Sequence, residues 1–346
     1  MDAVTRRAAD ARDARIVVEW ITGRHVSFQR AVFCSRGAST ATAGASLGVD
    51  DVLFAPVGSP VETAAHVVRY DGDFGDIGDV LHVAGHAVEL QHYSAAAYVE
   101  LFGPTAMRFL DADGWRAFLA DADLARSAGV FTSPMTDARL RLADAEVFSA
   151  PFTETAPVSV HVRADDRVTV GAQGWAIGTL DDVDRVLSMP QPRWAAFAGV
   201  VEPGDLIRDL TSRPWLARYV GAAGLSSVSG LAPTDRIDGF GWSALSDPCP
   251  GAIARFDDPF LARTSEGLLL ISPRTRRRQR LSETTAVVVA TLHASVDVSD
   301  AVDRLAQTLD LTVVKARALC GEAEERLGVH CGVSIEASAA IAGGEA

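Results

Sequence analysis

Residues 258–286 read DPFLARTSEGLLLISPRTRRRQRLSETTA, and this stretch sets the order of elements in the last third of the chain. Two short apolar runs, 260–264 and 268–272, flank a Ser-Glu-Gly turn, which is typical of a β-hairpin with glycine at a position of positive φ. Pro273 ends the second run, because proline cannot donate a ladder hydrogen bond. The segment 277–281 predicts a third, basic strand.

Three helices are predicted to follow this sheet. Ser282 is a suitable N-cap for the first of them, and Glu283 suits its first turn. The β-branched run 286–290 alone would favour a strand, but the cap before it and the helical patterns after it favour a buried helix. Apolar residues at helical spacing predict a second helix from about Ser299 and a third from about Thr312.

The third predicted helix carries small residues on its apolar face, at Ala316, Cys320 and Ala323. Small residues allow two helices to pack closely. They can also leave a shallow slot for the side chains of a partner. The sequence alone leaves both interpretations open.

Arginine is concentrated in the third strand and in the turn before it. The five positions are Arg274, Arg276, Arg277, Arg278 and Arg280. Charge on an edge strand discourages unwanted pairing with other chains, and it also suits an acidic partner. Basic and acidic residues balance over 258–330, so the rest of the chain carries the net charge of -13. That excess of acid argues against nucleic-acid binding by the whole protein.

The order of these elements resembles the PqqD-like family, the recognition elements of ribosomally synthesised, post-translationally modified peptide (RiPP) pathways. The resemblance rests on Asp258, the turn at Gly267 and residues 281–286, LSETTA, which are similar to the family's L-N-E-T-A entry into its first helix. Ser282 stands where the family commonly has Asn. The resemblance implies a winged-helix-like module of three short strands and three helices that binds the leader of a precursor peptide.

In that family the leader adds as an extra strand to the third strand and packs beside the third helix. Strand hydrogen bonds give about 2–6 kcal/mol net, while ordering a disordered peptide costs about 2–5 kcal/mol. Groove contacts and arginine–carboxylate pairs must therefore supply most of the affinity. Carried to this chain, the resemblance places the peptide against Arg277, Arg278, Gln279, Arg280, Leu281, Val313, Ala316, Arg317 and Cys320.

The larger N-terminal part reads as mixed α/β. Strands are predicted at 15–21, 26–33 and 52–57, a hairpin at 158–163 and 167–170, and helices at 114–125, 214–223 and, after the capping box Ser59-Pro60-Val61-Glu62, up to Val68. The segment 246–251 is a suitable boundary. We therefore expect a mixed α/β scaffold or enzyme-docking domain at 1–250, a peptide-binding domain at 251–330 and a flexible tail at 331–346.

Signals for catalysis are weak in the N-terminal part. His82, His86 and Glu89 would share one face of a helix, with His92 nearby, but the pattern around them alternates with period two and predicts a hairpin with Val88 and Leu90 inward. Gly241-Trp242-Ser243 lacks the last glycine of a nucleophile elbow, and there is no P-loop. We expect no catalytic residues, no metal site and no cofactor.

An acidic N-terminal domain ahead of a C-terminal recognition element resembles the recognition protein of daptide-type clusters. That resemblance implies a non-catalytic adaptor that delivers the precursor peptide to a maturation enzyme such as an oxidoreductase. Neither nucleic acid nor a membrane is expected as a partner. No apolar run approaches the ~18–20 residues that span a bilayer, and the charged N-terminus has no apolar signal core, so a cytoplasmic location is expected.

Two alternatives remain open at this point. The first is an enzyme within 1–250 that acts on a peptide held by the C-terminal module. The second is a winged-helix DNA-binding regulator, whose recognition helix would be the third predicted helix. That helix offers Lys315, Arg317 and Arg326 against Glu322, Glu324 and Glu325, a poor balance for contacts with DNA.

Overall fold

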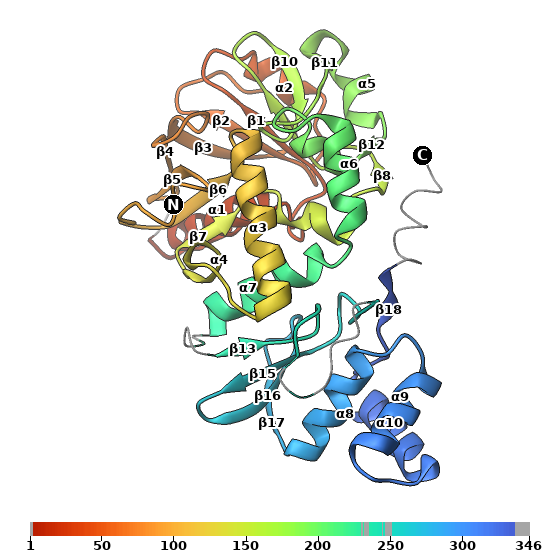
Figure 1. Cartoon of the computed structure of the whole chain (residues 1–346). Coiled ribbons are helices and arrows are strands. Elements are labelled where there is room, and N and C mark those ends of the chain that lie inside the picture. The colour runs from red at the N-terminus through yellow and green to blue at the C-terminus, as the bar shows by residue number, and fades with distance from the viewer. Residues whose placement is uncertain (1–2, 230, 232–234, 244, 246–250, 336–346) are drawn as a thin grey trace. The chain divides into compact units, whose positions relative to one another are not determined.

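The computed structural model describes residues 3–229, 231, 235–243, 245 and 251–335. The chain forms two compact units of mixed α/β structure (Figure 1). Unit 1 comprises residues 1–118 and 139–208, and unit 2 comprises residues 119–138 and 209–346. The units therefore divide the chain at other points than the expected boundary at 246–251. Residues 246–250 of that segment lie outside the described residues.

Unit 1 is built on a ten-stranded sheet of order β11-β10-β9-β1-β2-β3-β4-β5-β6-β7. Neighbours from β9 to β3 run parallel, as do β5, β6 and β7, while β3-β4-β5 and β9-β10-β11 are antiparallel. The strands are β1 Ala31–Cys34, β2 Val52–Pro56, β3 His66–Gly72, β4 Val80–Val83, β5 His86–His92, β6 Thr105–Arg108, β7 Leu140–Leu142, β9 Ser159–Val162, β10 Arg167–Val170 and β11 Ala176–Thr179.

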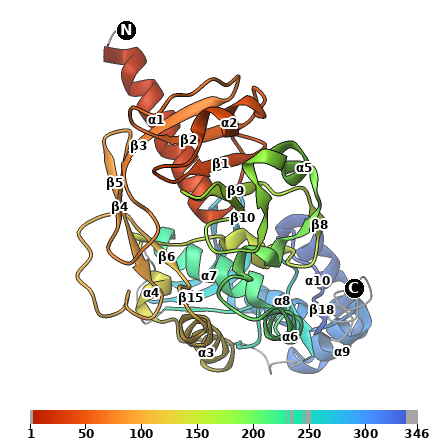
Figure 2. The same ribbon diagram turned by 90° about the horizontal axis from the view of Figure 1, so that it is seen from above.

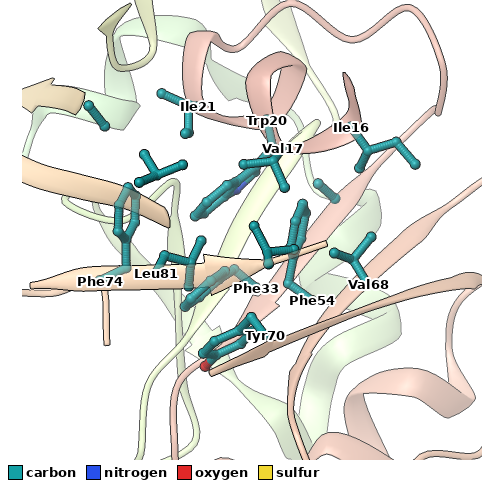
Figure 3. Packing of buried hydrophobic residues seen from close by; sticks show 14 of the residues in the cluster. Ile16, Val17, Trp20, Ile21, Phe33, Phe54, Val68, Tyr70, Phe74 and Leu81 are labelled. Carbon is teal, nitrogen blue, oxygen red and sulfur yellow. The ribbon is translucent and has the colours of Figure 1, made fainter. Parts of the chain in front are cut away.

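The first helix of unit 1, α1 (Ala3–Thr22), covers one face of this sheet (Figure 2). Trp20 stacks on Phe33 of β1 at 4.8 Å between ring centroids, and it lies 4.7 Å from Phe54 of β2 (Figure 3). The predicted strand 15–21 is thus wrong. Its apolar residues fall one helical turn apart and pack as a stripe onto the sheet, which overrides the strand propensity of the β-branched run.

The expected helix after Ser59 is also wrong. Ser59 Oγ donates to the carbonyl of Pro56 at 2.7 Å, closing the turn after β2 instead of capping a helix. No helix forms between Ser59 and His66, where β3 begins. Of the strand predicted at 26–33, only β1 from Ala31 onward is extended. The hairpin predicted at 158–163 and 167–170 is confirmed as β9 and β10.

The first two-thirds of the chain also contains α-helices, 3₁₀ helices at Ala145–Ser149, Leu180–Asp182 and Arg193–Phe197, and one small two-stranded sheet. The helices predicted at 114–125 and 214–223 are confirmed as α3 and α7. The elements are α2 Thr40–Ala45, α3 Ala112–Ala128, α4 Ser133–Thr136, α5 Val183–Ser188, α6 Pro203–Ser212, α7 Leu216–Ser229, and the strands β8 Glu154–Thr155 and β12 Gln191–Pro192.

Unit 2 holds a four-stranded antiparallel sheet of order β13-β15-β16-β17, followed by three helices (Figure 1). The order from β15 to α10 is the predicted one, but the sheet has a fourth strand, β13, that was not predicted. The strands and helices are β13 Arg236–Ile237, β15 Phe260–Thr264, β16 Gly267–Ile271, β17 Arg278–Leu281, α8 Glu283–His293, α9 Val298–Thr308 and α10 Val313–Leu327.

The caps of these helices are local and strong. Ser282, Asp297 and Thr312 each accept a hydrogen bond from a main-chain N–H in the first turn of α8, α9 and α10. Apolar residues of the three helices form one core with Leu261 and Leu270 of the sheet. The β-branched residues of α8 face this core, which explains why they sit in a helix.

Residues 331–335, expected to begin a flexible tail, are ordered by pairing. Strand β18 (Val333–Ser334) pairs with β14 (Ala252–Ile253) in a two-stranded sheet. Cys331 is buried beside it. The rest of the expected tail, 336–346, lies outside the described residues. Among the described helices, none combines the length and the apolar character needed to cross a membrane.

Candidate functional site

Strand β17 forms the outer edge of the small sheet in unit 2. Within the described part of the chain its one strand neighbour is β16 (Figure 1). Arg278, Gln279 and Arg280 are exposed, and Leu281 is half-buried. An exposed edge presents main-chain donors and acceptors to which another extended chain can add.

The open edge is formed by the main chain of two arginines. Ser272 N donates to Arg277 O at 3.0 Å, and the β16–β17 ladder continues from there without a change of register. In an antiparallel pair, residues that bond to the neighbour alternate with residues whose N–H and C=O point away. Arg277 and every second residue after it therefore bond toward β16, while Arg278 and Arg280 direct their main-chain groups to the open edge.

The side chains around this edge are strongly basic. Arg277, which lies just before β17, is exposed like the arginines of the strand itself. The Arg280 guanidinium donates to the carbonyl of Glu266 in the hairpin turn, which holds it over the sheet. Arg274 lies 3.8 Å from Asp257 in an exposed pair. Exposed pairs are weak, so the edge keeps a positive character.

The predicted contact face on α10 is only partly available. Ala316 and Cys320 are 0% and 3% exposed and belong to the hydrophobic core, which contradicts their placement in a peptide-binding groove. Their small side chains serve close packing with α8 and α9, the alternative that the sequence left open. Val313 is 51% exposed, and Arg317 is exposed. These two are the residues of the predicted set on α10 that a partner can reach.

A buried polar cluster lies behind the beginning of β15. The Asp258 carboxylate is 1% exposed and accepts from both the main-chain N–H and Nδ1 of His330, each at 2.7 Å. His330 follows α10, so this carboxylate ties the end of the last helix to the start of the sheet. Two hydrogen bonds to one buried carboxylate are among the stronger fixed contacts a chain can make.

Arg218 of α7 also belongs to this buried cluster. Its guanidinium, 1% exposed as a residue, donates to the carbonyl of Asp258 and stacks over the Phe260 ring at 3.5 Å. Burial lowers the pKa of Arg218 to about 9, while the nearby carboxylates of Asp258 and Asp238 oppose that shift. The cation is retained at neutral pH, because these carboxylates and carbonyls replace its lost water.

Asp238 and His293 complete the cluster beside a small cavity. Burial raises the pKa of Asp238 to about 7, against a hydrogen bond from Ser243 at 3.3 Å and the charge of Arg218. Burial lowers the pKa of His293 to about 3, with Arg218 acting in the same direction. The cavity of about 20 Å³ is lined by Asp238, Ser243 and His293 and has room for one water molecule.

This cluster links α7, the start of β15, α8 and the segment after α10 inside unit 2, with Asp238 beside it. Sequence reasoning found Asp258 only through the family resemblance. It missed the other members, whose scattered positions in the sequence give no periodic or motif signal.

In unit 1, the histidines singled out by sequence lie on the predicted hairpin. His82 is on β4 and His86 on β5, and Val88 and Leu90 point inward as expected. Gln91, which the same alternation would place outward, is instead buried at 7% exposure. No group of three or more metal-ligating side chains is found among the described residues.

A serine–histidine contact occurs at the carboxyl ends of two parallel strands of unit 1. Ser35 Oγ, just after β1, lies 2.6 Å from His161 Nε2 on β9. Burial lowers the pKa of His161 to about 3, and the nearby cation of Arg108 adds to that shift. The other ring nitrogen, Nδ1, has no hydrogen-bond partner within the described structure. The carboxylate that would orient the imidazole in a catalytic triad is therefore missing from that nitrogen.

No known family model matches this chain, and comparisons with curated proteins and with solved structures find no match either.

Proposed function

We propose that this chain is a non-catalytic recognition protein that binds the leader of a ribosomally synthesised precursor peptide and presents it to a maturation enzyme. In this proposal, the sheet and three helices of unit 2 are a winged-helix-like, PqqD-like recognition element. The observation that carries it is β17, an exposed basic edge strand whose open side is lined by the main chain of Arg278 and Arg280.

The edge suits an extended peptide for two physical reasons. Pairing with Arg278 and Arg280 would give about four strand hydrogen bonds, worth about 2–6 kcal/mol net, which the cost of ordering a peptide largely cancels. The surrounding arginines add favourable contacts with acidic side chains. On α10, Val313 and Arg317 can extend the contact, whereas Ala316 and Cys320 stabilise the core and have no part in it.

Unit 1 would then serve as the docking part for the maturation enzyme. The segment between β5 and β6 exposes two large apolar side chains, Tyr98 at 90% and Phe102 at 86%. Neighbouring exposed apolar residues of this kind mark protein–protein contacts more often than plain surface does. We expect Tyr98→Ala with Phe102→Ala to weaken enzyme binding while leaving peptide affinity unchanged, measured separately by surface plasmon resonance.

The test of peptide recognition uses the full chain. Arg218 of α7 bonds to Asp258 at the start of β15 within one compact unit, and a fragment that begins after α7 would lose this contact. The probe is a fluorescein-labelled peptide from the N-terminal half of a short precursor encoded beside the gene, read by fluorescence polarisation. Reversing Arg277 and Arg278 to Glu should weaken binding and flatten its dependence on salt. The matched control reverses Arg116 and Arg208, two arginines of unit 1 that are each 70% exposed in the side chain.

Two outcomes of this titration would contradict the proposal. The first is the same affinity in both double variants, because it would place the peptide away from β17. The second is no saturable binding by the unmodified protein at any salt concentration.

A second candidate function, an enzyme in unit 1 acting on the bound peptide, has one observation in its favour. Ser35 and His161 are in contact where α/β sheets commonly bind ligands, at the carboxyl ends of parallel strands. A fluorophosphonate probe tests it directly. Labelling that is lost in Ser35→Ala and in His161→Gln would favour an acyl-transfer enzyme, and an unlabelled protein would leave the pair a packing contact.

A further inference from the structure

The pleat of β17 separates its side chains by face. Leu281 packs against the core of α8, α9 and α10. Because side chains alternate along a strand, Gln279 shares that face, while Arg278 and Arg280 lie on the opposite face. The register confirms the assignment: Gln279 is opposite Leu270, which is part of the same core.

At both Arg278 and Arg280, the main chain and the side chain are available to an added strand in different ways. Their main-chain groups point to the open edge, and their side chains lie on the face away from α8. A residue of an added antiparallel strand that bonds to Arg278 therefore stands directly opposite it, with its side chain on the same face. The same holds for Arg280. Directly opposite Cβ atoms are about 4.5–5.5 Å apart, within reach of an arginine–carboxylate pair.

The added strand thus meets two cations at positions separated by one residue. The residue between them lies opposite Gln279, on the face of the half-buried Leu281. An apolar side chain there continues the surface of the core and shields Leu281 from water.

We propose that the peptide paired with β17 carries carboxylates at two positions separated by one residue, opposite Arg278 and Arg280, with an apolar residue between them. This inference rests on the proposed function and specifies its ligand as an acidic–apolar–acidic strand. Pairing of β17 with the same strand of a second copy is disfavoured, because it would place arginines near arginines.

The test compares peptides of identical composition on the full chain. The probes are capped hexapeptides EVEVEV and EEEVVV, with KVKVKV as the charge-reversed form, each flanked by Gly-Ser. Affinity is measured by calorimetry, and the bound segment is located by hydrogen exchange of β17. We expect EVEVEV to bind roughly fivefold to thirtyfold more tightly than EEEVVV, and KVKVKV not to bind.

Charge-reversed variants give the matching result on the protein side. Arg278→Glu with Arg280→Glu should reverse the preference, so that KVKVKV becomes the tighter ligand. Gln279→Glu places one charge on the other face of the same strand. It should keep the preference for EVEVEV over EEEVVV, although overall affinity falls.

The possible failures are distinguishable. Equal affinities for EVEVEV and EEEVVV, with β17 protected by both, would refute the proposed alternation of acidic and apolar residues in the peptide. The proposal that β17 binds a peptide would still hold. If neither these peptides nor the precursor leader protects β17, the proposed function is overturned together with the inference.

Discussion

Replacing Asp258 by Asn tests the buried cluster at the start of β15. The carboxylate accepts two hydrogen bonds from His330 at 2.7 Å, and both oxygens are used. An amide has one acceptor oxygen, so its NH₂ group must face one of the two His330 donors. The substitution also removes the carboxylate that does most to oppose the lowered pKa of the buried Arg218.

The expected cost follows from these two losses. One hydrogen bond to a charged group contributes about 1.5–3 kcal/mol, and removing one of two opposite buried charges costs up to about 3–5 kcal/mol. The contributions overlap, so we expect a loss of about 3–5 kcal/mol. Hydrogen exchange followed by mass spectrometry should show it as amide exchange roughly 150- to 4,000-fold faster in β15 and α8, if exchange proceeds through opening of unit 2.

The neighbouring residue supplies the control. The Asp257 side chain is 64% exposed, and its partner Arg274 is exposed as well, so Asp257→Asn should cost less than about 1 kcal/mol. Peptides from β1 and β2 of unit 1 provide an internal reference within each sample. If Asp258→Asn exchanges like Asp257→Asn in β15, the buried carboxylate does not hold the sheet to the last helix and the reasoning is refuted.

Three further substitutions have expected outcomes. Ala316→Trp overfills the core and should lower the melting temperature of unit 2, whereas the exposed neighbour variant Ala318→Trp should leave it nearly unchanged; equal melting curves would put Ala316 at the surface. The pKa of Asp238 is raised to about 7, so the folded state holds a proton that the unfolded chain releases above about pH 4, and its stability contribution is lost as pH rises from 4 to 7. Asp238→Asn should therefore lose less stability than the unmodified protein between pH 5 and pH 8 in urea titrations, by at most about 3 kcal/mol, and parallel pH profiles would contradict this. Gly239→Ala adds a Cβ 2.7 Å from Arg218 Nη2 at a φ of +97°, so a melting temperature at or above that of the unmodified protein would be inconsistent with the structure.

Local chemistry explains why the elements of unit 2 were predictable. The hairpin depends on Gly267 at a φ of 117°, and the helices begin at Ser282 and Thr312, whose side chains accept the expected first-turn hydrogen bonds. These signals act within a few residues and need no knowledge of the rest of the fold.

Unit 1 was harder to predict because its local signals conflict with its tertiary contacts. The run from Arg15 to Ile21 favours a strand by composition, yet it folds as a helix because its stripe packs on Phe33 and Phe54. Ser59 has the residue type of a cap, but its hydroxyl is used by the turn after β2. Which partner a side chain finds depends on the sheet, and the sheet joins segments far apart in the chain.

The candidate site likewise has one part that the sequence predicts and other parts that it does not. The basic edge was predictable, since the arginines and the hairpin lie within one continuous stretch. The groove was not, because small residues such as Ala316 and Cys320 serve a tight helix contact as well as an open slot, and only burial separates the two. The buried cluster joins Arg218, Asp258 and His330 across more than half of unit 2, so no window of sequence contains it.

The arginines of the edge strand can be explained in two ways, as protection against unwanted strand pairing and as a means of recognising an acidic peptide. Both follow from the same geometry. A strand added opposite Arg278 and Arg280 places its side chains about 5 Å from theirs, inside the Debye length of about 8 Å at physiological salt, so charge there is screened only in part. A neutral or basic strand gains little beyond its backbone bonds and a copy of β17 is repelled, while an acidic strand gains at both positions. Protection and selectivity are then one property of the edge, and raising the salt concentration should weaken both together.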